Sequence, residues 1–126
     1  MKRATALILL IGILLFAKGA AEPGRVDTSG MQLMHTTAYC LKGVTASGGT
    51  THHGIAACDP HVGDVAVIYS IDGKYLDTVE ITDRGGTEGL HNGTVIDVWK
   101  CNKTQCKSWM RLTGGRVYVQ WIEGNG

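Results

Sequence analysis

Three aspartates lie in segments whose neighbours make a charged side chain unusual. Asp83 ends the alternating apolar segment Val-Glu-Ile-Thr-Asp, Asp97 interrupts Val-Ile-Asp-Val-Trp, and Asp59 lies in Ala-Cys-Asp-Pro. A carboxylate is unfavourable in apolar surroundings unless it is paired, protonated or used in a reaction. Proton transfer is the chemistry that suits such residues, because one carboxyl group can give a proton and take it back. These three aspartates are therefore the candidate catalytic residues.

The same aspartates also have a purely structural interpretation. Asp83 could cap the turn that follows it, and Asp97 could bond a nearby backbone amide, as aspartates commonly do. Strand alternation, however, places Asp83 in one row with Val79 and Ile81. An aspartate in an ordinary surface strand falls in the polar row instead. We therefore expect both carboxylates at the rim or in the interior of a barrel.

Short apolar segments separated by glycine predict that the chain is mainly β. The expected strands are residues 33–39, 65–71, 74–82, 94–99 and 116–122. The Asp72-Gly73 pair predicts a hairpin between the second and third of these. Cys106, Trp109 and Met110 have helical spacing before a Gly-Gly pair, which predicts one short helix. The glycine-rich segment 41–57 is predicted to be a long loop, and loops of that length are usually functional.

The first residues indicate export. Lys2 and Arg3 precede a nearly unbroken apolar segment, residues 4–17, which runs into small residues up to Ala21. This pattern predicts a secretory signal peptide over residues 1–21, and a retained membrane anchor is the alternative. We expect a loosely ordered leader over 22–32 and one folded domain over 33–126. The protein would be secreted, extracellular or associated with the cell wall, with no stable membrane insertion after signal cleavage.

The charge balance argues against one class of partner. Removing Lys2, Arg3 and Lys18 takes the twelve basic residues to nine, against eleven acidic ones, for a formal charge of −2. The remaining basic residues are scattered singly along the sequence. Because phosphate binding needs clustered Lys and Arg, nucleic acid is not an expected partner.

Four cysteines in a short exported chain predict two disulfides rather than a metal site. The Cys-x2-Cys spacing of a zinc site is absent. If Asp59 and Asp97 converge, Cys58 would pair with Cys101 and Cys40 with Cys106, whereas a local Cys101 to Cys106 bond remains open. The histidines, which include His52, His53, His61 and His91, form no His-Glu-x-x-His pattern, so no metal is expected.

Several motifs occur in the same order as in a known family. They are Thr37-Ala38-Tyr39, residues 43–48, residues 54–60 with Gly63, Asp83-Arg84-Gly85-Gly86, residues 93–98 and Val117-Tyr118-Val119. Over about 90 residues from Thr36 onward, the chain resembles the secreted 3D domain, which is named for its three aspartates. That domain is related to the catalytic barrel of membrane-bound lytic transglycosylase A. The resemblance implies a six-stranded double-psi β-barrel with one short helix.

The resemblance also implies an activity. It is the cleavage of peptidoglycan glycan strands between N-acetylmuramic acid and N-acetylglucosamine without water, which leaves a 1,6-anhydro sugar and needs no cofactor. Asp97 matches the family's aspartate in the Ile-Asp-hydrophobic strand, so it is the expected general acid and base. Asp83 and Asp59 are expected beside it, and their crowding should raise the pKa of the group that carries the proton.

Five further residues are expected to contact the substrate. They are Tyr39, Thr45, Ser47, Gly85 and Gly86. Hydroxyls in a Gly-rich loop also serve as plain turn formers, and a tyrosine at a strand end can belong to the core. Arg84 departs from the family's usual small hydroxyl residue, and an ion pair with Asp83 would keep that aspartate ionised. Wall-binding and wall-loosening barrels that cleave nothing use the same fold, so a binding module is the alternative function.

Overall fold

Six short strands close into a barrel whose order differs from their order in the chain. The structure is a computed structural model that describes residues 24–124. Around the barrel the order is β1-β5-β2-β4-β3-β6. The elements are β1 (Gln32–Tyr39), β2 (Ile55–Ala57), η1 (Asp59–His61), β3 (Val65–Tyr69), β4 (Tyr75–Asp83), α2 (Glu88–Asn92), β5 (Val95–Trp99), α3 (Lys103–Thr113) and β6 (Arg116–Ile122). The expected mainly β fold with a six-stranded barrel is confirmed.

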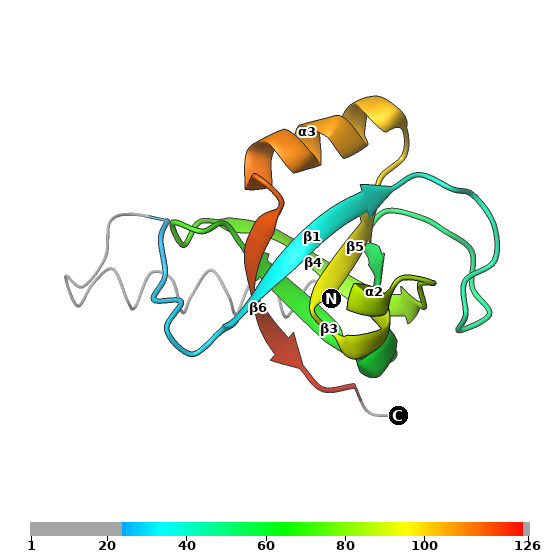
Figure 1. The fold of residues 1–126 in the computed structure, drawn as a ribbon, viewed down its shortest axis with the longest axis horizontal. Helices are drawn as coiled ribbons and strands as arrows, with labels where there is room; N and C mark the ends of the chain where they lie inside the picture. The colour runs from blue at the N-terminus through cyan, green and yellow to red at the C-terminus, as the bar shows by residue number, and fades with distance from the viewer. Residues whose placement is uncertain (1–23, 125–126) are drawn as a thin grey trace.

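Two of the strand pairs are parallel, and they determine how the chain crosses the barrel. β1 pairs with β5 and β2 pairs with β4 in parallel, whereas the remaining neighbours are antiparallel. Parallel partners cannot be joined by a tight turn, so longer connections run over one side of the barrel. The loop between β1 and β2 joins strands that are not neighbours in the barrel, and α3 lies across the barrel on another side (Figure 1). Two parallel pairs with crossing connections agree with the double-psi expectation.

The barrel interior is filled by apolar side chains from alternate positions of all six strands. Its buried members are Met34, Ala56, Cys58, Ala66, Ile68, Val79, Ile81, Ile96, Val98, Val117 and Val119, with Trp109 added from α3. Thr36 also points inward and is buried. The Trp109 indole N–H donates to Thr36 Oγ1 at 2.9 Å, and that hydroxyl donates to the Ile96 carbonyl at 3.0 Å. These bonds satisfy the polar atoms that come with α3 and fix the helix against β1.

The predicted strands correspond to five of the six strands in the structure. The sixth, β2, lies inside the segment 41–57 that was predicted to be a loop, and three residues are too few to show an alternating pattern. The short helix α2 was also missed; it ends at Asn92 and is capped by Gly93, which has a φ of 83°. The predicted hairpin joins β3 to β4, and Ser70 N–H donates to the Lys74 carbonyl at 2.8 Å across its turn.

The described residues include only part of the N-terminal segments that were predicted. The signal peptide, residues 1–21, lies outside the described residues. The described part of the expected leader contacts the β3–β4 turn. Arg25 forms a bridge with Lys74 and an ion pair with Asp72 at 3.3 Å, and Val26 N–H donates to the Gly73 carbonyl at 3.0 Å. Within residues 24–124, no helix combines the length and apolar character that crossing a bilayer requires.

The cysteines depart from the predicted two disulfides, because all four are free thiols in the structure. The pairing of Cys58 with Cys101 is wrong. The β2–β5 register, continued by one residue, places Cys58 opposite Ile96, so Cys101 lies five residues further along. The end of β5 at Trp99 is already three residues past that point, about 10 Å at 3.3 Å per residue, beyond the 7 Å that a disulfide allows between Cα atoms. Cys40 and Cys106, in contrast, are neighbours, since the Cys40 thiol adds to burial in raising the pKa of Cys106.

Candidate active site

Two of the three aspartates are brought into one row on the outer wall of the barrel. In the register, Asp97 lies opposite Thr37 on one side and opposite Ala57 on the other, and Ala57 also lies opposite Asp83. Residues paired across neighbouring strands project from the same face of a sheet. We call these four residues the Asp97–Asp83 row. The two strands that carry the aspartates are roughly 10 Å apart, with the small Ala57 between them.

A β-bulge explains how Asp83 reaches this face. Ala56 pairs with Ile81 but Ala57 pairs with Asp83, which leaves Thr82 as an extra residue in β4. Without it, Asp83 would follow Ile81 into the interior; the bulge turns it to the outside, as bulges do when they re-aim a side chain. The alternative that the carboxylates lie in the barrel interior is therefore wrong. The Thr82 hydroxyl is buried and has no hydrogen-bond partner among the described residues.

The surroundings of Asp97 favour its protonated form more than water does. It is half-buried in the middle of β5, and Thr37 Oγ1 donates to its Oδ1 at 2.9 Å. Burial raises the pKa of Asp97, and the nearby charge of Asp83 raises it further, while the hydrogen bond from Thr37 acts in the opposite direction. The net effect is an upward shift, so the acid form of Asp97 persists to a higher pH than in a free aspartate.

Asp83 lies at the end of β4 among hydrogen-bond donors. Its Oδ1 accepts the backbone N–H of Ala46 at 3.1 Å and that of Arg84 at 2.9 Å, and Tyr39 Oη donates to Oδ2 at 3.5 Å. Burial and then the charges of Asp83 and Asp97 raise the pKa of Tyr39, so its phenol remains a donor. No ion pair joins Arg84 to Asp83 within the described part of the chain. In this row, the Asp97 carboxyl group accepts a hydrogen bond from Thr37 alone among the described side chains. The Asp83 carboxyl group accepts hydrogen bonds from Ala46, Arg84 and Tyr39.

Asp59 lies outside this row and performs a different task. Its Oδ1 accepts the Gly85 N–H at 2.8 Å, and its Oδ2 lies 3.3 Å from His91 Nδ1. The Gly85 bond is the largest cause that lowers the pKa of Asp59, and the His91 bond and the charges of His91 and Arg84 act in the same direction. Asp59 is therefore an ionised clamp that ties η1 to the segment after Asp83.

The two predicted substrate-binding glycines differ sharply in their surroundings. A Cβ on Gly85 would lie 1.9 Å from Leu90 Cδ1 and 2.9 Å from both Leu90 Cβ and Cγ. A Cβ on Gly86 would meet no atom within 4 Å. Gly85 therefore permits a close approach between its segment and α2, whereas Gly86 leaves open space in front of the backbone.

The loop between β1 and β2 covers the row and is fastened to the end of β4. Ser47 N–H donates to the Thr82 carbonyl at 3.0 Å, next to the Ala46 bond to Asp83. Thr45 is buried, its N–H donates to the Gly49 carbonyl at 2.8 Å, and its hydroxyl lies 3.2 Å from the Ser47 hydroxyl. Among the described residues, neither hydroxyl bonds a carboxylate. In this conformation Thr45 and Ser47 shape the loop.

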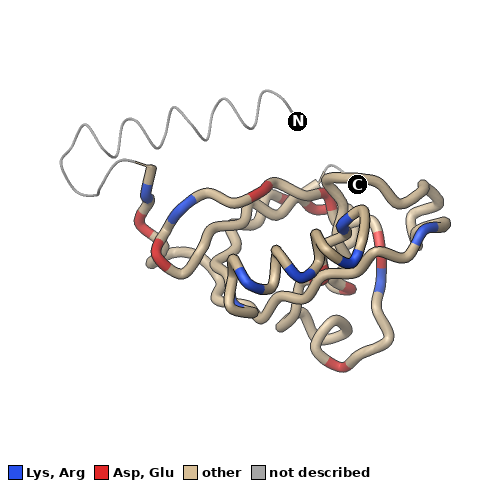
Figure 2. The backbone as a smooth tube through the Cα atoms, turned by 90° about the horizontal axis from the view of Figure 1, so that it is seen from above, with Lys and Arg blue, Asp and Glu red and all other residues tan. Residues whose placement is uncertain are grey.

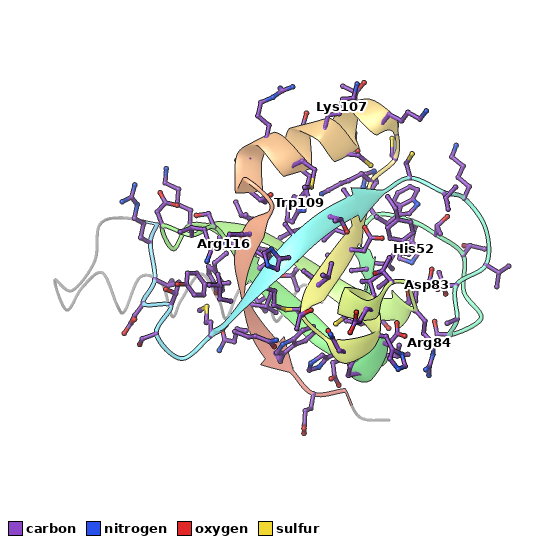
Figure 3. The ribbon with its side chains drawn as sticks, viewed as in Figure 1. His52, Asp83, Arg84, Lys107, Trp109 and Arg116 are labelled. Atoms are coloured by element: carbon purple, nitrogen blue, oxygen red, sulfur yellow. The ribbon has the colours of Figure 1, made fainter. Side chains whose placement is uncertain are left out.

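A hollow of about 240 Å³ opens between this loop and the barrel. It is lined by Tyr39, Leu41, Lys42, Gly43, Val44, Thr51 and Asp83. Leu41 and Val44 are 76% and 75% exposed, so two apolar side chains stand at its mouth. Asp97 is not among the lining residues. Figure 3 places Asp83 and Arg84 at the side of the barrel where this loop hangs, away from α3.

The sequence reasoning assigned no role to two residues of the site. Thr37 was noted only as part of a motif; its spacing of two from Tyr39 on a predicted strand was the signal that both share a face. The Ala46 backbone amide carries no signal of its own, because any residue type supplies an N–H. Both contact a carboxylate of the row.

The described residues offer no candidate metal site. Within residues 24–124, no group of three or more His, Cys, Asp or Glu side chains is placed to hold an ion. His91 lies against Asp59, and His61 lies 3.0 Å from Asp64 in a separate pair.

Comparisons with known proteins add no family assignment. A scan against models of known protein families and a search of curated proteins both give no match to this chain.

Proposed function

We propose that the protein is a secreted lytic transglycosylase. It would cleave the β-1,4 bond between N-acetylmuramic acid and N-acetylglucosamine of peptidoglycan without water and form 1,6-anhydro-N-acetylmuramic acid. The observation that carries the proposal is the row itself, in which the half-buried Asp97 lies near the hydrogen-bonded Asp83. The motif resemblance to the 3D domain supports the choice of substrate.

Asp97 is the proton carrier in this proposal. Its carboxylic acid protonates the glycosidic oxygen as the bond to the anomeric carbon breaks. The resulting carboxylate accepts the proton of the muramic acid 6-hydroxyl as that oxygen attacks the anomeric carbon. Because the nucleophile belongs to the substrate, no second carboxylate is needed to activate water. Thr37 holds Oδ1 at 2.9 Å, which leaves Oδ2 for the proton.

Asp83 and Tyr39 have supporting roles. The positive charge that develops near the anomeric carbon is stabilised by a nearby anion, and backbone amides hold the Asp83 carboxylate in place for this. The small, buried Ala57 lies between the two aspartates. Asp59 acts indirectly, because it fixes the segment that follows Asp83 through Gly85.

The glycan strand must enter beneath the loop between β1 and β2. The 240 Å³ hollow is smaller than the roughly 300–1,000 Å³ of typical ligand pockets, and Asp97 lies outside its lining. Entry therefore requires the loop to lift away from the barrel. The exposed Leu41 and Val44 would then face the apolar side of a sugar ring.

A non-catalytic wall-binding module is the second candidate, and the position of Asp97 outside the hollow favours it. The two functions separate in one experiment. The purified protein is incubated with peptidoglycan sacculi, the pellet is assayed for bound protein, and the supernatant is analysed by mass spectrometry. A transglycosylase releases muropeptides with anhydro-muramic ends, whereas a pure binder sediments with the sacculi and releases none. The binder outcome would overturn the proposed enzyme.

A further inference from the structure

The basic and acidic residues of this chain are strongly segregated along the sequence, although no two of the basic residues beyond the predicted signal peptide are adjacent. Residues 98–122 contain five basic residues and no Asp or Glu. Of the nine basic residues that follow the predicted signal peptide, this leaves four elsewhere against all eleven acidic ones, a formal charge of −7. The folded chain therefore has one basic region on an otherwise acidic molecule.

Helix α3 gathers three of these charges on a single face. Lys103, Lys107 and Arg111 are four residues apart, so they follow one side of the helix at steps of about 6 Å. All three are exposed, and none forms an ion pair in the part of the chain that the structure describes. Figure 2 shows Lys and Arg positions recurring along this helix. We call these three residues the basic face of α3.

The basic face points away from the barrel. Trp109 and Thr113 are the buried residues of α3, and Trp109 is anchored to Thr36 inside the barrel. At about 100° per residue, Lys107 and Arg111 lie on the far side of the helix from these two, and Lys103 lies on its flank. In Figure 3 Lys107 lies on α3, well separated from Asp83. The basic face is therefore exposed to solvent on the side of the helix that does not pack on the barrel.

Helix stability alone does not account for this arrangement. Like charges four residues apart repel one another, and Lys103 at the first helical position opposes the positive end of the helix dipole. No acidic residue in the first turn compensates. An anionic partner would remove both penalties at once.

We propose that the basic face of α3 binds a linear polyol-phosphate polymer of the cell wall. Such a chain carries one phosphodiester charge per short repeat, so successive phosphates can contact successive basic side chains of the helix. The choice of a wall polymer rests on the proposed function, which brings the protein to peptidoglycan. Nucleic acid fits less well, because the exposed face of α3 carries no aromatic side chain on which a base could stack.

The test measures binding of fluorescently labelled poly(glycerol phosphate) by anisotropy at 50 and 200 mM NaCl. We expect the affinity of the wild type to fall steeply with salt, as counterion release requires. The combined variant Lys103→Gln, Lys107→Gln and Arg111→Gln should bind at least about tenfold more weakly at low salt. Lys74→Gln, which changes an exposed lysine on the β3–β4 turn, should bind like the wild type. Unchanged thermal midpoints confirm that both variants fold.

Two results would overturn the inference. One is equal binding of the polymer by the triple variant and the wild type. The other is at least tenfold tighter binding of a single-stranded oligonucleotide of equal charge, which would make nucleic acid the partner. Digestion of sacculi stripped of phosphate polymers is measured in parallel. If the stripped sacculi remain intact while polymer binding depends on α3, the proposed enzyme fails but the polymer site stands.

Discussion

The two adjacent glycines after Asp83 provide a sharp test of how the candidate site is built. Gly85→Ala introduces a methyl group 1.9 Å from Leu90 Cδ1, while Gly86→Ala introduces one into open space. Neither glycine has a positive φ, so backbone strain does not distinguish the two variants. The comparison therefore isolates the close packing between this segment and α2.

The expected difference in stability follows from the contacts. A rotamer change of Leu90 cannot relieve the clash, because its Cβ is also within 2.9 Å of the added methyl and moves only with the backbone. Leu90 is 6% exposed, so displacing α2 uncovers a buried leucine. Overpacking of this kind costs about 1–3 kcal/mol, and a compatible glycine-to-alanine change returns about 0.4–1 kcal/mol. We expect the free energy of unfolding of Gly85→Ala to be about 2 kcal/mol lower than that of Gly86→Ala.

Urea denaturation of both variants and the wild type measures this difference. Because the Gly85 N–H also holds Asp59 at 2.8 Å, displacement of the segment should weaken that clamp too. Gly86→Ala should be as stable as the wild type or slightly more stable. Equal free energies of unfolding for the two variants would refute the packing described between this segment and α2.

Three further predictions concern the bulge, the thiols and the proton of Asp97. Thr82→Val removes a buried, unpartnered hydroxyl and should raise the free energy of unfolding by up to about 1 kcal/mol; a loss of stability would show that the hydroxyl has a partner. Oxidised glutathione should link Cys40 to Cys106, stabilise the fold by about 2–4 kcal/mol and leave the other cysteines reduced; peptide mapping that finds a different bond would contradict this. Since the pKa of Asp97 is raised in the folded protein, its contribution to stability is present at low pH and is lost as pH rises through that pKa. The release of anhydro-muropeptides should decline over the same range, and an activity that rises there would argue against an acid role for Asp97.

Much of the fold was predictable because its strands alternate clearly. The five predicted strands and the hairpin at Asp72-Gly73 depend on local patterns that the barrel preserves. The short helix was visible from the spacing of Trp109 and its neighbours, and Trp109 does pack into the core. Such local patterns predict secondary structure because buried positions repeat with the period of the strand or helix that carries them.

The site was less predictable because its geometry depends on pairing between distant segments. Strand alternation alone predicts that Asp83 and Ile81 project from the same face of the sheet. Only the register between β2 and β4 reveals that Thr82 is an extra residue, which turns Asp83 to the other face. β2 itself is three residues long and lies in a glycine-rich segment, so nothing local marks it as a strand. The separation of Asp59 from the other aspartates likewise follows from its bond to Gly85, which joins residues 26 positions apart.

The most direct test of the proposed chemistry is the digestion of purified sacculi by Asp97→Asn. This variant retains the side-chain shape and the acceptor for Thr37 but cannot supply the proton. We predict that the release of anhydro-muropeptides falls by roughly 10²–10⁴-fold while binding to sacculi is retained. Asp27→Asn, the same change at an exposed residue outside the row, should release the wild-type amount. Near-normal release by Asp97→Asn would contradict the assignment of Asp97 as the general acid and base.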